Sequence, residues 1–114
     1  MRRKAILFGV AGLCVTAMSL SGCGRNETVV QADAPLYPEA VYVYQLGCDT
    51  CHGENLQGGI GPSLQHVGSR MTLRQIERRI EVGAGPMPPY AAKNDAILTR
   101  AQIVAVAKWL EMKK

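Results

Sequence analysis

Cys48-Asp49-Thr50-Cys51-His52 is the stretch of this 114-residue sequence that decides its fold, because two thiols and an imidazole stand close together in it. Thiol pairs at this spacing serve in redox sites, in zinc sites and in covalent haem attachment. A redox pair is expected to follow a strand in a βαβ unit, and no strand pattern precedes Cys48. A zinc site with four ligands would have to add the isolated His66, because the sequence has no second cysteine pair.

The order of the three side chains suits a haem. Two thiols at this spacing, presented at the end of a helix, can reach both vinyl groups on one edge of a porphyrin. The imidazole of the next residue is then held under the iron as an axial ligand. We therefore interpret Cys48 and Cys51 as the attachment sites of one covalent haem c, and His52 as a ligand of its iron.

Residues 1–22 have the three-part form of an export signal. A basic start is followed by an apolar run, which is too short for a comfortable membrane span, and by small residues. The signal ends in Leu20-Ser21-Gly22-Cys23, which resembles the lipobox of bacterial lipoproteins and implies acylation of Cys23 after cleavage. Two alternatives are ordinary cleavage nearby, with Cys23 as a spare thiol, and an uncleaved signal that stays in the membrane as an anchor.

The charge of the chain changes once this signal is removed. Three of the 13 Lys and Arg residues lie in residues 1–22, so 10 remain against all 9 Asp and Glu residues, and the mature chain is near +1. Two haem propionates would bring the charge to about −1, so the alkaline pI indicates no nucleic-acid partner. Only Cys48 and Cys51 remain in the folded part, which is too few for a disulfide framework.

The mature chain divides into two parts. Residues 23–36 are polar, contain Pro35 and show little apolar periodicity, so we expect a flexible tether. Residues 37–114 are expected to form the folded domain.

The domain has helical periodicity in three places and no strand alternation of useful length. The first helix is expected to start at Pro38 and to end before Gly47. Thr72 and Thr99 each stand three residues before a glutamine, which predicts a capping box at the start of the other two helices. The fold class is therefore all-α, with three main helices and long loops. Such a chain has a thin core, and a buried haem would fill its centre.

The side chains available for the sixth coordination position are Met71, Met87, Met112 and His66. Met112 is near the C-terminal lysines, and Met71 precedes a capping box, where an apolar residue commonly packs as a hydrophobic staple. Met87 lies among three prolines, in a loop that shows no backbone pairing pattern and whose prolines fix the direction of the thioether. A neutral thioether suits ferrous iron, so we expect Met87 to be the second axial ligand.

Three further features complete a recognisable order. The haem motif is followed by Gly61-Pro62-Ser63-Leu64, by Gly83-Ala84-Gly85-Pro86-Met87-Pro88 and by a terminal helix containing Trp109. In this order the chain resembles class I cytochromes c. With the lipobox, it is similar to the small lipid-anchored cytochromes c (cytochrome c-551 type) of Gram-positive bacteria. The likeness covers residues 37 to 112.

The resemblance implies roles for several residues. Pro62 would accept a hydrogen bond from His52 through its carbonyl, Leu64 would pack on the haem, and Arg70 would turn toward a propionate. The first and last helices would cross where Ala40 and Tyr44 meet Val106 and Trp109.

The function that these features predict is one-electron transfer at the outer face of the cell membrane, without enzymatic activity. The expected partners are respiratory membrane complexes, namely a quinol-oxidising complex and a terminal oxidase, and the membrane itself through Cys23. The alternative is a haem enzyme or gas sensor whose sixth coordination position is open.

Overall fold

The computed structural model describes residues 26–91 and 97–114. These residues form six helices: α1 (Val29–Asp33), α2 (Pro38–Gln45), α3 (Cys48–His52), α4 (Val67–Arg70), α5 (Leu73–Val82) and α6 (Arg100–Glu111). They contain no strand, and their only β-type pairing is an isolated bridge between Ala84 and Met87. The all-α prediction with three main helices, α2, α5 and α6, is confirmed.

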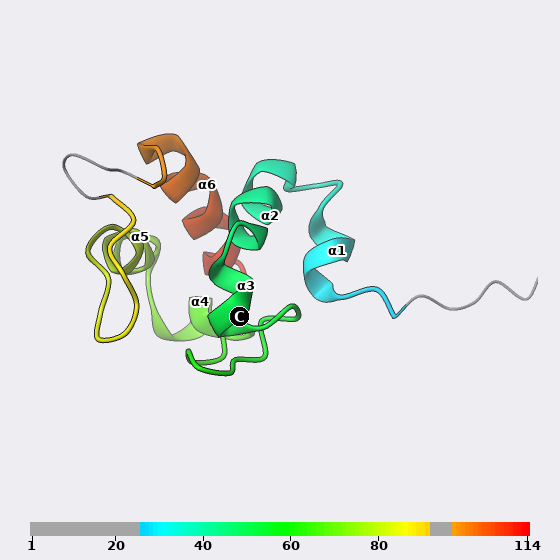
Figure 1. The fold of residues 1–114 in the computed structure, drawn as a ribbon. Helices are drawn as coiled ribbons and strands as arrows, with labels where there is room; N and C mark the ends of the chain where they lie inside the picture. Colours follow the sequence, from blue (N-terminus) through cyan, green and yellow to red (C-terminus); the bar gives the residue numbers. More distant parts are fainter. Residues whose placement is uncertain (1–25, 92–96) are drawn as a thin grey trace, which may run out of the picture.

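The described helices are arranged around α6, with α2 on one side of it and α5 on the other (Figure 1). None of them is long and apolar enough to cross a membrane. The predicted export signal and Cys23 lie outside the described residues.

The crossing of α2 and α6 forms the centre of the core. Tyr44 and Trp109 pack edge to face, with ring centroids 5.5 Å apart and an interplanar angle of 68°. Ala40 and Val106 are buried in the same cluster. The predicted meeting of the first and last main helices is therefore confirmed, with Tyr44 against Trp109.

Two of the helix starts follow the predicted capping boxes. At the start of α5, the Thr72 side chain accepts from the backbone N–H of Gln75, and the Gln75 side chain accepts from the N–H of Thr72. Thr99 and Gln102 make the same reciprocal pair at the start of α6. Each box satisfies backbone donors that the first turn of a helix leaves without partners.

The expected tether is wrong where the structure describes it. Val29–Asp33 forms α1, which has a capping box of its own between Thr28 and Gln31. Val30 is 2% exposed and belongs to the main hydrophobic cluster. The carboxylate of Asp33 accepts a hydrogen bond from Trp109 Nε1 at 2.7 Å and pairs with Lys113. The segment folds because one valine and one aspartate find partners in the domain, a gain that local periodicity does not reveal.

Candidate haem site

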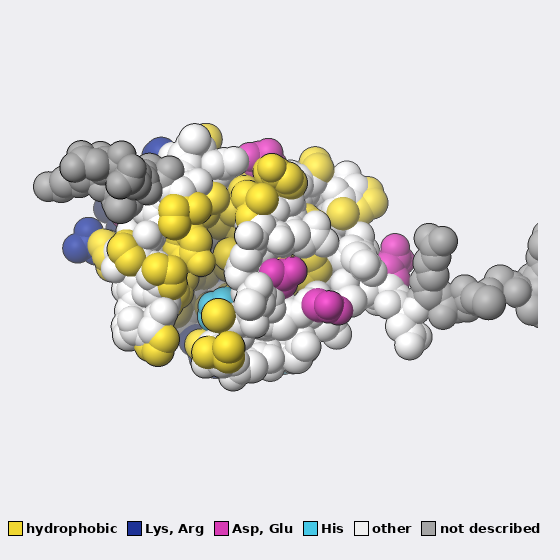
Figure 2. All heavy atoms as spheres, viewed as in Figure 1, with side chains coloured by type: hydrophobic (Ala, Val, Ile, Leu, Met, Phe, Trp, Pro, Cys, Tyr) yellow, Lys and Arg dark blue, Asp and Glu magenta, His cyan; other side chains and the backbone are white. Residues whose placement is uncertain are grey.

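An apolar cavity of about 510 Å³ lies between α3, α5, α6 and the loop that contains Met87. This volume is in the usual range for binding sites of small molecules and cofactors. Hydrophobic side chains gather around the hollow between α3 and α5 (Figure 2). Core residues from the main helices form its inner wall: Tyr44, Ile76, Ile80, Val106 and Leu110. One side of the packed hydrophobic core thus forms a wall of the cavity.

Helix α3 brings the two thiols and the imidazole of the motif to this cavity. Cys48 and Cys51 are half-buried, carry no disulfide and line the cavity together with His52. Residues three apart share one face of a helix, which is why both thiols reach the same space. The hydroxyl of Tyr44 donates to the carbonyl oxygen of Gly53 at 2.7 Å and so connects α2 to the end of α3.

The ring of His52 is held in one tautomer. Its side chain is largely buried, and its Nδ1 lies 2.8 Å from the carbonyl oxygen of Pro62, the bond that the resemblance implied. A carbonyl oxygen only accepts, so Nδ1 carries the proton and donates it. The lone pair of Nε2 is then free for a metal, and the hydrogen bond makes the imidazole a stronger donor.

The loop after α3 folds back over His52 through its backbone. The N–H of Gly58 donates to the carbonyl of His52 at 2.7 Å, and the N–H of Gly61 donates to the carbonyl of Cys51 at 2.8 Å. Gly61 lies against the imidazole, because a Cβ placed on it would be 2.8 Å from His52 Cε1. Sequence reasoning recorded Gly61 as part of a motif but missed this steric role.

The Met87 loop forms another wall of the cavity. The backbones of Ala84 and Met87 exchange two hydrogen bonds of 3.1 and 3.0 Å, so the expectation that this loop lacks backbone pairing is wrong. Gly85 has a φ of +54° at the first central position of the turn, where primed hairpin turns need a positive φ. Gly83 has a φ of +69°, and a Cβ on it would lie 2.3 Å from the carbonyl oxygen of Met87. The backbone that carries the half-buried Met87 is therefore fixed by hydrogen bonds and by close packing against Gly83.

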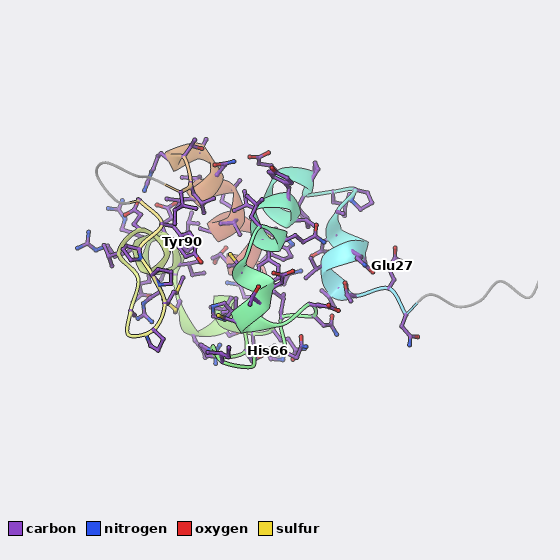
Figure 3. All side chains as sticks on the ribbon, viewed as in Figure 1. Glu27, His66 and Tyr90 are labelled. Carbon is purple, nitrogen blue, oxygen red and sulfur yellow. The ribbon has the colours of Figure 1, made fainter. Side chains whose placement is uncertain are left out.

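The other candidates for the sixth coordination position differ in whether they line the cavity. His66 does not line the cavity, and its Nδ1 lies 2.8 Å from the carbonyl oxygen of Lys114 (Figure 3). Met112 is 44% exposed and accepts a hydrogen bond from the hydroxyl of Tyr37. Met71 is half-buried and does line the cavity. Of the four candidates, Met71 and Met87 therefore line the cavity, whereas His66 and Met112 do not.

Leu64 and Arg70, to which the resemblance assigns roles beside the haem, also line the cavity. The guanidinium of Arg70 donates from Nη2 to the carbonyl oxygen of Ser63 at 2.7 Å, so it already has one partner in the loop after α3. Sequence reasoning missed Tyr90, whose backbone N–H donates to the carbonyl of Ile80 at 3.0 Å and whose side chain lines the cavity. Burial raises the pKa of Tyr90, and the neighbouring thiols raise it further.

Burial and a neighbouring carboxylate favour the protonated form of the Cys48 thiol. Burial, and then the negative charge of Asp49, raises the pKa of the Cys48 thiol to about 11. The attacking thiol of a redox Cys-x-x-Cys site has the opposite property, a lowered pKa that favours the thiolate. The described residues also contain no group of three metal-binding side chains of the kind a zinc site requires.

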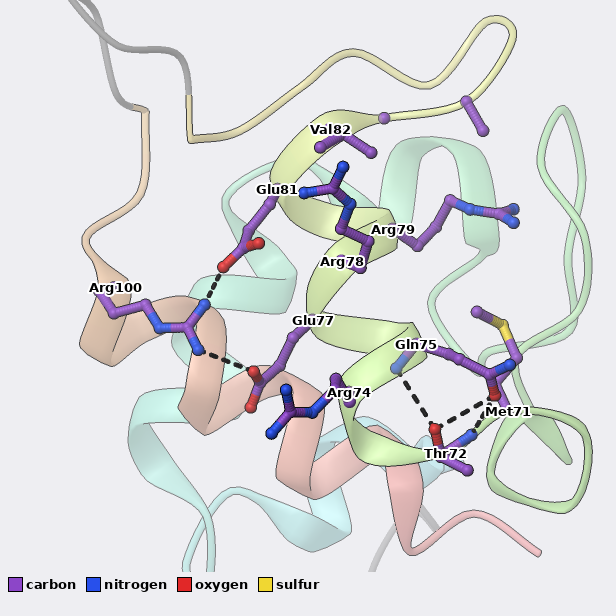
Figure 4. Close-up of a pocket in the computed structure, with 12 residues that line it drawn as sticks. Met71, Thr72, Arg74, Gln75, Glu77, Arg78, Arg79, Glu81, Val82 and Arg100 are labelled. Atoms are coloured by element: carbon purple, nitrogen blue, oxygen red, sulfur yellow. Dashed lines mark hydrogen bonds and ion pairs between the residues drawn. The ribbon is translucent and has the colours of Figure 1, made fainter.

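These residues fit a haem. The cavity is apolar, two thiols stand at its edge, and one buried imidazole presents a free Nε2 into it. A second hollow, along α5, is a groove whose wall includes arginines and glutamates (Figure 4). Arg100 spans it by binding Glu77 at 2.8 Å and also Glu81. The groove contains no thiol and no histidine, so the chemistry of the motif belongs to the apolar cavity.

Comparison with known proteins gives the same assignment. A family model described as cytochrome c oxidase, cbb3-type, subunit III matches residues 36–110. Cytochrome c-551 of Bacillus subtilis is 34% identical over 101 residues, which are 83% of this chain and 85% of that protein. Cytochrome c-550 of the same species is 34% identical over 85 residues, 75% of this chain and 69% of that protein.

A shorter match carries a higher identity. The cytochrome c subunit of the menaquinol:cytochrome c reductase of Geobacillus thermodenitrificans is 51% identical over 41 residues, which are 36% of this chain and 16% of that protein. Together with the two thiols and the imidazole at one apolar cavity, the match over residues 36–110 shows that this chain belongs to the cytochrome c family, whose members hold covalently bound haem c.

Proposed function

We propose that this protein is a single-haem carrier of one electron at a time, with His52 and Met87 as the axial ligands of the iron. The proposal rests on one observation: the cavity wall holds two side chains of the types that bind haem iron, and neighbouring backbone groups fix the position of each. His52 is oriented by the carbonyl of Pro62, and Met87 by the paired backbone of its loop. A haem iron supplies a one-electron couple, and filling both axial positions limits the change in geometry between its two oxidation states.

Met87 is favoured over Met71 by its surroundings. The backbone of Met87 is paired with that of Ala84, and Gly83 lies close to its carbonyl oxygen. Met71 follows α4 and precedes the capping box of α5, the position at which an apolar side chain acts as a staple. Thioether ligation also matches the apolar lining, because it adds no charge to the cavity.

The proposed electron donor is a quinol-oxidising membrane complex, and the proposed acceptor is a terminal oxidase. The similarity to cytochrome c subunits of menaquinol:cytochrome c reductases supports the first partner. We further propose that a lipid on Cys23 keeps the protein at the extracytoplasmic face of the cell membrane. The lipobox-like sequence at residues 20–23 supports this anchor.

The ligand assignment is tested by replacing each cavity methionine in the exported, haem-loaded protein. Met87→Ala should abolish the sulfur-to-iron absorption of the ferric state, whereas Met71→Leu should leave it in place. Survival of that absorption in Met87→Ala would show that the assignment is wrong. Rapid binding of carbon monoxide to the unmodified ferrous protein would instead support an enzyme or gas sensor with an open coordination position.

The anchor is tested separately. Mature protein with Cys23 should partition into detergent, and Cys23→Ala protein with the same haem content should remain in the aqueous phase. Detergent extraction of the Cys23→Ala protein to the same extent would refute a lipid at this residue.

A further inference from the structure

We propose that α1 is a clip that fixes the start of the domain to the α2–α6 pair, so that the haem cavity is held away from the membrane. The inference rests on the proposed lipid at Cys23 and adds to it a defined orientation. The clip consists of Val30 in the core and Asp33 bound to Trp109 and Lys113. Helix α1 precedes residues 36–110, the range that the family model matches, so the clip lies outside the matched part of the chain.

The clip has partners on α2, on the loop after α3 and on α6. Val30 lies in the main hydrophobic cluster, and Val29 donates its backbone N–H to Asn55 Oδ1 at 2.8 Å. The Asp33 carboxylate accepts from Trp109 Nε1 at 2.7 Å, and Lys113 pairs with the same carboxylate. These contacts join the segment to the loop after α3 and to the last helix. A five-residue helix is not stable alone in water, so its presence depends on these contacts.

The position of the clip sets the side of the molecule from which the chain leaves. Helix α1 lies beyond α2 and α3 when viewed from α5 and the Met87 loop (Figure 1). No residue of α1 lines the cavity, which lies between α3, α5 and the Met87 loop. A membrane attachment made through α1 therefore approaches the domain from the side remote from Met87.

The clip also shortens the reach of the chain. Thr28 is five residues after Cys23, so a lipid at Cys23 lies at most about 18 Å from the start of α1. Without the clip the first fixed helix would be α2, and Pro38 is 15 residues after Cys23, a reach of about 50 Å. A long tether would let the cavity turn toward the bilayer, whereas a short one on the α1 side does not.

The experiment uses the exported, haem-loaded and lipid-bearing protein on phosphatidylcholine vesicles, whose zwitterionic surface removes a bias from net charge. A fluorophore on a fraction of the lipid headgroups is the donor, and the haem absorbs its energy when the two are close. Its fluorescence lifetimes are compared for four proteins: the wild type, Val30→Asp, Val29→Asp, and a variant with Gly and Ser alternating in place of residues 28–33.

The two valine variants form a matched pair, because Val30 is 2% exposed and its neighbour Val29 is 43% exposed. Val30→Asp places a charge in the core and should release α1, whereas Val29→Asp should retain it. The Gly and Ser variant removes the clip whatever the effect of a single substitution, and it keeps the length of the chain.

The wild type and Val29→Asp should show one narrow lifetime distribution with weak energy transfer. Val30→Asp and the Gly and Ser variant should show a broader distribution with an added short-lifetime component, because the cavity can then approach the bilayer. Equal lifetimes in the wild type and the Gly and Ser variant would show that α1 does not restrict the orientation of the domain, and would overturn the proposal. Failure of the wild type to bind the vesicles, or equal binding by Cys23→Ala, would instead refute the proposed anchor.

Discussion

Gly61 lies so close to the ring of His52 that a Cβ on Gly61 would be 2.8 Å from His52 Cε1 and 3.0 Å from its Nδ1. The next residue, Pro62, accepts the hydrogen bond from the same Nδ1 at 2.8 Å. One short stretch of loop therefore supplies both a steric limit and a hydrogen-bond acceptor for the imidazole. The orientation of the His52 ring therefore depends on the absence of a side chain at Gly61.

Replacing Gly61 by alanine should push the imidazole away from Pro62 and weaken their hydrogen bond. A weaker bond makes the imidazole a poorer donor to ferric iron, so the reduction potential should rise. A hydrogen bond worth about 1 kcal/mol corresponds to about 40 mV for one electron, which bounds the expected shift. Redox titration measures it, and Gly59→Ala is the control, because a Cβ there makes only an ordinary contact of 3.4 Å. Equal shifts in both variants would contradict this role.

Replacing Gly83 by alanine should displace the Met87 loop. A Cβ on Gly83 would lie 2.3 Å from the carbonyl oxygen of Met87, and its positive φ adds strain of order 1–3 kcal/mol. We expect a lower free energy of unfolding and a weakened sulfur-to-iron absorption, with both thioether attachments retained. Gly85→Ala is the matched control, because Gly85 also has a positive φ but nothing lies within 4 Å of the added Cβ. Loss of the absorption in both variants would assign the effect to backbone strain alone.

The helix starts show how far the sequence determines this fold. Thr72 and Thr99 predicted α5 and α6 because each box is followed by several apolar residues at helical spacing. Thr28 begins the same Thr-x-x-Gln pattern, which could have predicted α1. The segment is too short to show helical periodicity. Its stability comes from Asp33 and Val30 meeting side chains distant in sequence, which local patterns do not encode.

The candidate haem site also has features that the sequence predicts and features that only the folded structure reveals. The thiols and the imidazole of residues 48–52 could be predicted, because their spacing along a short stretch of sequence is itself the signal for haem attachment. The contact of Gly61 with His52 and the approach of Gly83 to Met87 depend on how two loops return to the cavity, so spacing alone could not reveal them. The Pro62 bond came from resemblance, and the structure supplies its distance.

The attachment of α1 should depend on pH through Asp33. Burial raises the pKa of this carboxyl, but its hydrogen bonds with Lys113 and Trp109 and the charge of Lys113 outweigh that effect, so the pKa lies below its ordinary value of 3.8. A lowered folded-state pKa stabilises the protein above that ordinary value, and the contribution is lost as the pH falls through the folded-state pKa.

Asp33→Ala should therefore lower the free energy of unfolding at neutral pH by about 1–3 kcal/mol, since Trp109 Nε1 loses its buried partner. Denaturant unfolding of the haem-loaded wild type and Asp33→Ala proteins across acid pH measures the difference between their free energies of unfolding. Effects of acid that are common to both proteins, such as those on the iron ligands, cancel in this difference. We expect the difference to shrink as the pH falls below 3.8. A constant difference would show that the charge of Asp33 does not stabilise the clip.

The charges of this protein are separated along the chain, and the separation predicts how it meets a redox partner. Residues 26–66 contain acidic side chains but no lysine or arginine, whereas α5 carries Arg74, Arg78 and Arg79, and both of its glutamates are bound to Arg100. The groove on α5 shares Met71, Arg79 and Ala84 with the wall of the haem cavity. An acidic partner surface attracted to α5 would thus arrive beside the redox centre, and such attraction raises association rates at low ionic strength.

Arg78→Glu should therefore slow reduction of the protein by a purified menaquinol-oxidising complex at low salt, and the difference from the wild type should vanish as salt screens the charges. Lys108→Glu is the matched control, because it makes the same charge change on an exposed residue of α6 that lines neither the groove nor the cavity. Stopped-flow rates at several salt concentrations measure the effect. Equal slowing by the two variants would mean that only net charge steers the encounter, and faster reduction of Arg78→Glu would mean that the partner presents a basic surface to α5.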